Sequence, residues 1–114
     1  MAINRLSTGG PIIAEFNRQT ATTYTFVLSD ANLIVEGSNA GAITFTIPAD
    51  ATTNFPIGTT ITIIQTGAGQ ITVAGAGGVT LNGTPGAKLR TQWSAATITK
   101  RLANTWVIYG DVVA

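Results

Sequence analysis

The stretch that decides the fold class is Ala42-Ile-Thr-Phe-Thr-Ile-Pro48. Its three large apolar residues alternate with two threonines, and a period of two is typical of a β-strand that buries one face. The final proline ends the strand, because proline has no N–H to donate within a central strand of a sheet. The stretch therefore predicts a strand over residues 42–47, with Ile43, Phe45 and Ile47 on its buried face.

Similar alternating runs follow one another along the chain, separated by short segments rich in turn-forming residues. They predict nine strands and no helix, over residues 24–28, 33–36, 42–47, 59–65, 70–74, 79–81, 88–93, 96–102 and 105–109. We expect antiparallel pairing, because the chain shows no crossover segments of the kind that parallel strands need. We also expect hairpins around Gly67-Ala-Gly69 and Ala103-Asn104, and a turn at Asn82-Gly83.

The predicted fold class is all-β: a compact antiparallel β-sandwich, jelly-roll-like, or a barrel of about nine short strands. Strand order is not visible in the sequence, so the sandwich and the barrel both stay open. The first residues differ from the rest, because Gly9-Gly10-Pro11 interrupts any regular element and Ile12, Ile13 and Phe16 follow no clean period. We therefore divide the chain into an N-terminal arm, 1–21, and a β-sandwich domain, 22–114.

The composition of the 114-residue chain excludes several kinds of site. The chain has no cysteine, which rules out disulfide scaffolds and thiol nucleophiles, and no histidine, the commonest metal ligand and general base. No apolar run approaches the 18 or so residues of a membrane helix. The segment Met1–Thr8 lacks the apolar core of a signal peptide, so we expect the chain to stay in the compartment where it is made.

The remaining candidates for chemistry are weak. The carboxylates Asp30, Glu36 and Asp50 stand in or beside predicted turns, where acidic residues are common for local reasons. The glycine clusters at 67–69 and 75–78 lack the third glycine of a dinucleotide fingerprint and the Gly-Lys-Ser/Thr of a phosphate loop. We expect no enzyme, no catalytic or metal residues and no cofactor.

The net charge of +1 is too small to attract nucleic acid or membrane by itself, although residues 1–50 sum to −2 and residues 51–114 to +3. The cations of the second half are Lys88, Arg90, Lys100 and Arg101. Together with Trp93 and Trp106 they resemble the basic and stacking residues of a single-strand-binding barrel. The strand parity places Trp93 on the face opposite its basic neighbours, so we expect both tryptophans in the core or in an inter-subunit contact, and no nucleic-acid partner.

The chain has 20 threonines, and the predicted strands carry them on the faces opposite their apolar residues. An uncharged, threonine-rich β-surface, with edges that Lys or Glu does not protect, is prone to association. It fits a homo-oligomer whose contacts cover those edges, or an ordinary solvated sheet face. Composition leaves both interpretations open.

Several short motifs, in consistent order from Tyr24 to the C-terminus, carry a resemblance to a known family. They are Tyr24-Thr-Phe-Val-Leu-Ser-Asp-Ala31, Thr46-Ile-Pro48, Phe55-Pro-Ile-Gly-Thr59, Gly67-Ala-Gly-Gln-Ile-Thr-Val73, Gly78-Val-Thr-Leu-Asn82, Lys88-Leu-Arg-Thr-Gln-Trp-Ser-Ala-Ala96 and Asn104-Thr-Trp-Val-Ile-Tyr-Gly-Asp111. In these motifs the chain resembles a β-domain of tailed-bacteriophage virion proteins. That domain recurs at the ends of tail and fibre proteins and in small head-decoration (cement) proteins.

The resemblance implies a non-enzymatic structural protein of the virion, assembled in the host cytoplasm and usually a homotrimer. Because the domain is preceded here by a short arm and no shaft, we expect a capsid decoration protein that binds the major capsid protein and bridges neighbouring shell subunits. The arm residues expected to contact a partner are Ile3, Arg5, Leu6, Ile12, Ile13 and Phe16. The alternative is a tail-fibre or spike tip that binds a host receptor or glycan, stacking Phe55, Trp93 or Tyr109 on sugar rings.

Overall fold

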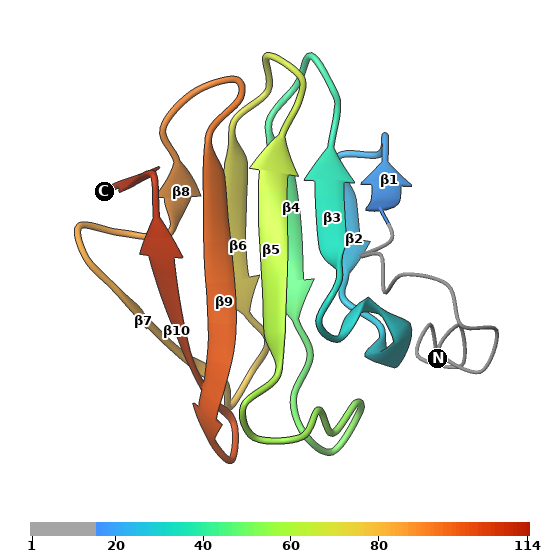
Figure 1. Cartoon of the computed structure of the whole chain (residues 1–114), viewed down its shortest axis with the longest axis vertical. Helices are drawn as coiled ribbons and strands as arrows, with labels where there is room; N and C mark the ends of the chain where they lie inside the picture. The colour runs from blue at the N-terminus through green and yellow to red at the C-terminus, as the bar shows by residue number, and fades with distance from the viewer. Residues whose placement is uncertain (1–15) are drawn as a thin grey trace, which may run out of the picture.

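The structure is a computed structural model that describes residues 16–114. It contains two β-sheets and one short 3-10 helix (Figure 1). The elements are β1 (Phe16–Gln19), β2 (Thr23–Thr25), η2 (Leu28–Asp30), β3 (Ile34–Gly37), β4 (Ile43–Ile47), β5 (Thr60–Gln65), β6 (Ile71–Gly75), β7 (Thr80–Gly83), β8 (Lys88–Leu89), β9 (Ala95–Leu102), β10 (Thr105–Gly110) and β11 (Val112–Val113). The all-β prediction is confirmed at this level, and the domain consists of two packed sheets.

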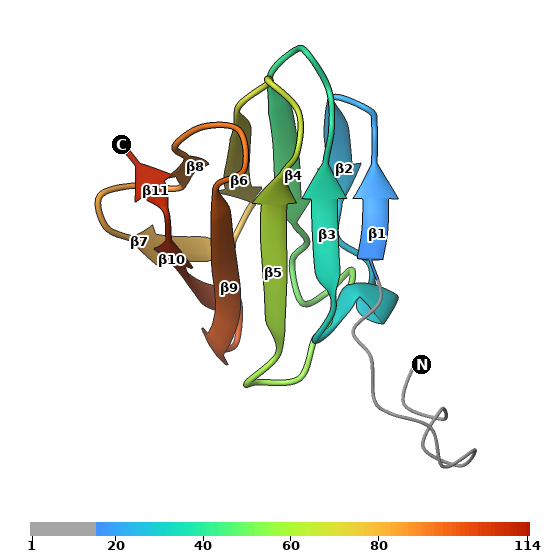
Figure 2. The ribbon, with the colours of Figure 1, turned by 45° about the horizontal axis from the view of Figure 1, so that its top comes forward.

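The first six strands alternate between the two sheets, so the chain runs in a solenoid-like coil. One sheet, here sheet A, has the order β1-β3-β5-β9-β10-β7, and the other, sheet B, has the order β11-β8-β6-β4-β2. Each turn of the coil adds one strand to each sheet, and Figure 2 shows the successive turns side by side. The coil is then interrupted, because the β9–β10 pair lies in sheet A between β5 and β7.

The expected antiparallel pairing is wrong for most of the molecule. Five of the nine strand pairs in the described part are parallel, and four are antiparallel. Parallel neighbours need a crossover, and here the strand in the opposite sheet, with its two corners, supplies it. A jelly roll is built from antiparallel Greek keys, and the first six strands pair only in parallel with one another.

The expected hairpin at Gly67-Ala-Gly69 is also wrong, because the loop there is a corner between the sheets. The backbone N–H of Gly69 donates to the carbonyl of Asn39, in the corner of the preceding turn, at 2.8 Å. A Cβ on Gly67 or Gly69 would collide with the backbone of Asn39 or Gly41. Glycine is required at this corner so that one turn of the coil can stack on the next.

The buried side chain of Gln65 closes the same corner from inside. Its Oε1 accepts from the N–H of Ile71 at 3.1 Å, and its Nε2 donates to the carbonyl of Gly67 at 3.2 Å. These bonds satisfy backbone groups that leave the ladders as the chain passes from β5 to β6. A polar residue at an inward position of β5 is therefore explained by the corner that follows it.

The core lies between the sheets and contains the expected apolar alternation. Ile43, Phe45 and Ile47 are fully buried, which confirms the prediction for this stretch. Two aromatic groups anchor the core: the rings of Tyr24, Phe26 and Phe45 meet edge to face, and Phe55 packs on Trp106 with ring centroids 5.5 Å apart. Edge-to-face pairs of this kind add about 0.5–1.5 kcal/mol beyond their area burial.

Of the other local predictions, one is confirmed and the rest are wrong. Ala103-Asn104 joins β9 and β10 as an antiparallel hairpin, as expected. Asn82-Gly83 is not a turn but the end of β7, which pairs in parallel with β10. The strand expected over 88–93 ends at Leu89, and strand β1 lies within the segment 1–21 that we expected to be an arm.

Candidate interaction surfaces

The outer face of sheet B is a ladder of threonines in register. Thr23, Thr44 and Thr72 are paired across β2, β4 and β6, and the next row contains Thr25, Thr46 and Ala74. Neighbouring strands lie about 4.8 Å apart and alternate residues of one strand about 6.6 Å apart, which sets the spacing of the hydroxyls. Because threonine is stiff at χ1, these rows form a flat and rigid surface. The threonines carry no charge, and one exposed cation, Lys88, continues the row beside Thr72.

The outer face of sheet A is more mixed. One row across five strands contains Phe16, Ile34, Thr62, Thr97 and Tyr109, so an aromatic ring stands at each end. The hydroxyls of Thr62 and Thr97 lie 3.3 Å apart and share a hydrogen bond. This face is also mostly uncharged, and its aliphatic and aromatic residues make it more apolar than the face of sheet B.

Two charged residues lie at the β1 side of the same face. The Nε of Arg18 is 3.2 Å from Oε2 of Glu36, and the guanidinium stands over the ring of Phe16, 4.9 Å from its centroid. Phe16 is the one predicted arm contact that the structure describes, and it is 45% exposed. The others, Ile3, Arg5, Leu6, Ile12 and Ile13, lie outside the described residues.

The three aromatic residues expected for glycan stacking have different surroundings. Phe55 is 1% exposed and packs on Trp106, so it has no face to offer a sugar, and the prediction is wrong for this residue. Trp93 is 71% exposed and Tyr109 is 50% exposed. The expectation that both tryptophans fill the core or a contact holds for Trp106, which is buried, whereas the Trp93 side chain points to solvent in the single chain.

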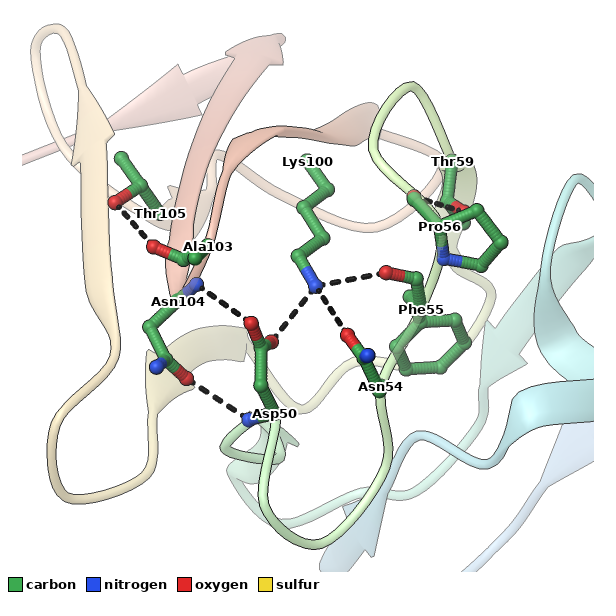
Figure 3. Close-up of polar contacts among 9 residues, drawn as sticks. All are labelled: Asp50, Asn54, Phe55, Pro56, Thr59, Lys100, Ala103, Asn104 and Thr105. Carbon is green, nitrogen blue, oxygen red and sulfur yellow. Dashed lines mark hydrogen bonds and ion pairs between the residues drawn. The ribbon is translucent and has the colours of Figure 1, made fainter.

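The carboxylate of Asp50 belongs to a buried polar cluster that joins the β4–β5 loop to β9 (Figure 3). The Nζ of Lys100, whose side chain is 1% exposed, donates to Oδ1 of Asp50 at 2.7 Å, to Oδ1 of Asn54 at 3.1 Å and to the carbonyl of Phe55 at 2.7 Å. The hydrogen bond from Lys100 lowers the pKa of Asp50, desolvation opposes it, and the bond from the Asn104 N–H lowers the pKa further. All three ammonium hydrogens have acceptors, so the cluster has a structural role and holds the β4–β5 loop against β9.

The carboxylate of Asp30 is the centre of a second cluster, between β1, β2 and η2. Its Oδ1 accepts from Nδ2 of Asn17 at 2.8 Å, and its Oδ2 accepts from the hydroxyl of Tyr24 at 2.6 Å and from the N–H of Val27 at 2.9 Å. Burial raises the pKa of Tyr24 well above its usual value, and the hydrogen bond and charge of Asp30 act in the same direction. The cluster fixes the start of β1 against η2.

The acidic residues thus have structural partners, and they are not gathered into one site. The described residues contain no group of three or more metal-ligating side chains of the His, Cys, Asp or Glu type. Two of the four cations of the second half are engaged: Lys100 is buried, and Arg90 makes a bidentate pair with Asp111 at 2.8 and 2.9 Å. The hydrogen bonds from Arg90 and from Ser94 lower the pKa of Asp111.

An apolar groove, which we call the Leu28–Ile57 groove, lies at the end of the molecule where β1 begins. It has a volume of about 430 Å³ and is lined by Leu28, Ala31, Asn32, Pro56, Ile57, Gly58 and Thr59. Leu28 is 55% exposed and Ile57 is 65% exposed. No local pattern in the sequence indicates this groove, because η2 and the β4–β5 loop, which form it, lie far apart in the chain.

No family model, no curated protein and no solved structure matches the chain. Within residues 16–114 there is no helix of the length and apolarity needed to cross a membrane.

Proposed function

We propose that this chain is a non-enzymatic structural protein of a bacteriophage virion: a capsid decoration, or cement, protein that forms a homotrimer and bridges neighbouring major-capsid-protein subunits. The observation that carries the proposal is the threonine ladder on the outer face of sheet B. A flat and rigid surface whose threonine rows carry no charge, with Lys88 beside them, loses little side-chain entropy and little charge solvation when the threonines are covered. Its role is to add buried area between subunits, which stabilises a shell by mass action.

The size of this face limits how a trimer can form. The five strands of sheet B contain 17 residues in all. With strands about 4.8 Å apart and a rise of about 3.3 Å per residue, they give a patch of roughly 270 Å². A stable interface buries about 800 Å² per partner. A trimer must therefore also use adjoining surface, and the open edge made by β1 and β2, the last strands of the two sheets, lies next to the ladder.

The oligomer is tested by light scattering on the purified chain and on two variants. Thr44→Lys introduces a cation in the middle of the ladder, where Thr44 is exposed, and we expect it to dissociate the trimer at micromolar concentration. Thr52→Lys places the same charge at another exposed threonine, in the β4–β5 loop, and is expected to stay trimeric. A monomeric wild type, or two variants that behave alike, contradicts the proposed interface.

The placement on the head is tested by the copy number of this chain relative to the major shell protein in purified particles. A ratio near one, or near one-third if only one three-fold position is used, supports decoration. A handful of copies per particle contradicts it and favours the tail. Deletion of residues 1–15, which leaves β1 intact, is expected to give a folded trimer that no longer binds shells.

The second candidate is a tail-fibre or spike tip that binds a host surface glycan. The exposed rings of Trp93 and Tyr109 favour it, since both are at least half exposed and aromatic faces stack on the apolar faces of sugars. Quenching or enhancement of Trp93 fluorescence by host polysaccharide, absent in Trp93→Ala, supports this role. A chain whose fluorescence is unchanged by polysaccharide, and that is abundant on the head, excludes it.

A further inference from the structure

We propose that the Leu28–Ile57 groove is the docking site of this chain's own residues Ile12 and Ile13. The groove is apolar and open. Gly58, at φ +94°, has nothing within 4 Å of the position where a Cβ would stand, so the backbone here is uncovered within the described part. None of the groove's seven lining residues is charged, so an occupant of matching chemistry is itself uncharged and apolar.

The start of β1 lies beside the groove. Asn17 donates to Asp30, the last residue of η2, at 2.8 Å, and Leu28, the first residue of η2, lines the groove. A 3-10 helix rises about 2 Å per residue, so the groove begins roughly 4 Å along the helix from this hydrogen bond. Figure 2 shows η2 next to the end of β1 at which the strand begins.

The chain length outside the described part fits this occupant. Ile13 precedes Asn17 by four residues, which span at most about 14 Å when extended. Residues 16–114 expose seven large hydrophobic side chains, and four of them lie at this end of the molecule: Phe16 at the start of β1, Val27 and Leu28 at η2, and Ile57 in the β4–β5 loop. Ile12 and Ile13 precede Phe16, the first described residue, by four and three positions in the sequence.

Docking on the same chain has an advantage over docking on a second copy. A tether of a few residues gives an effective concentration in the millimolar range or higher, which a separate chain does not reach in dilute solution. Gly9-Gly10, just upstream, would then act as the pivot beyond which residues 1–8 reach a partner. The proposal assigns Ile12 and Ile13 to a contact within one chain and does not rest on the shell-binding role. Of the six residues expected to contact a partner, it leaves Ile3, Arg5 and Leu6, upstream of the glycines, for that contact.

The test uses engineered disulfides, because the native chain has no cysteine to interfere. Ile13→Cys combined with Ile57→Cys, oxidised with diamide, is expected to form an intramolecular disulfide at a yield at least tenfold above that of the control pair. The control combines Ile13→Cys with Ser29→Cys. Ser29 is exposed and stands next to Leu28 in η2, close to the start of β1, but it does not line the groove.

The products are separated on a non-reducing gel. A disulfide-linked monomer for the Ile57 pair alone supports the proposal. A disulfide-linked dimer means that the arm docks on a second copy, and equal yields for the two pairs mean that the arm does not prefer the groove. Either result overturns the proposal.

Hydrogen exchange gives an independent measurement without added cysteines. The amides of residues 12–15 are expected to exchange at least tenfold more slowly in the wild type than in Ile57→Asp. Leu102→Asp, at another exposed leucine that does not line the groove, is the matched control and is expected to leave the protection unchanged. Coil-like exchange in the wild type, or equal exchange in the wild type and Ile57→Asp, overturns the proposal.

Discussion

The buried ammonium of Lys100 allows the sharpest test of the structure. Replacing Asp50 with alanine removes the one anionic partner that the described residues give to a cation whose side chain is 1% exposed. Removing one member of a buried ion pair costs about 3–5 kcal/mol, because the remaining charge is left uncompensated. The carbonyl of Phe55 and the amide oxygen of Asn54 still accept from Nζ, so we take the lower end, about 3 kcal/mol.

The double variant Asp50→Ala with Lys100→Met shows whether the stability lost in Asp50→Ala comes from an unpaired buried charge or from the loss of contacts alone. It also loses the hydrogen bond that the Asn104 N–H donates to the Asp50 carboxylate, but it leaves no cation in the core. Replacing both charges with apolar groups is often nearly neutral, so we expect the double variant to be more stable than Asp50→Ala alone, by about 1–2 kcal/mol. This reversal, in which the second substitution restores stability, is specific to a buried charge.

The assay is urea denaturation at fixed protein concentration, followed by the fluorescence of Trp106. This residue is buried beside Phe55, whose carbonyl accepts from Lys100. A loss of 3 kcal/mol corresponds to a fall in Tm of about 12 °C for a domain of this size. A double variant less stable than Asp50→Ala, or a cost of Asp50→Ala below about 1 kcal/mol, would refute the reasoning.

The pH dependence has a defined sign. Because the folded pKa of Asp50 lies below its unfolded value, the stabilisation from its charge is fully present above about pH 4. It is lost as the pH falls through the folded pKa. The stability difference between the wild type and Asp50→Ala is therefore expected to shrink between about pH 4 and pH 2. A difference that stays constant over this range would show that the charge of Asp50 contributes nothing.

Three further predictions concern other parts of the fold. Gly69→Ala places a Cβ against the carbonyl of Gly41 and is expected to lower the free energy of unfolding, measured in urea melts, by about 3 kcal/mol or more. The control Gly77→Ala has open space around the new Cβ and is expected to stay within about 0.5 kcal/mol of wild type. Equal effects of the two substitutions would contradict the stacked corner. Trp93→Gly relieves a backbone at φ 73° and is expected to raise the free energy of unfolding in urea melts by up to about 1 kcal/mol; a loss of stability would contradict the strain. Tyr24→Phe removes a 2.6 Å hydrogen bond to a buried carboxylate and is expected to cost about 1.5–3 kcal/mol at neutral pH. Because the pKa of Tyr24 is raised, wild-type stability should fall as the pH rises above about 10, and this fall should be weaker in the variant.

The sequence was sufficient for the strand content and for much of the core. The alternation in residues 42–47 predicted the three residues that β4 buries, because a strand's side-chain period is a local property. The alternation also placed β5, β6, β9 and β10 within one or two residues of their observed bounds. It failed at residues 90–93, where the chain leaves the sheet after Leu89 and Trp93 adopts a positive φ.

Strand pairing could not be derived in the same way. The glycine-rich loop at 67–69 has the composition of a hairpin turn and of a solenoid corner alike. What distinguishes them is the backbone of Asn39 and Gly41 lying against the loop, and this contact involves residues nearly thirty positions earlier. The choice between parallel and antiparallel pairing was therefore made by stacking between turns of the coil, which no local pattern encodes.

The same distinction between local pattern and long-range contact applies to the candidate surfaces. The sequence alone determined that the chain is rich in threonine, poor in charge and without cysteine or histidine, and these properties follow from composition. Only the tertiary structure brought threonines of three strands into one ladder, buried Phe55, exposed Trp93 and formed the Leu28–Ile57 groove. The physical reason is that each of these features depends on contacts between residues distant in the chain, whereas strand formation depends on the period of their neighbours.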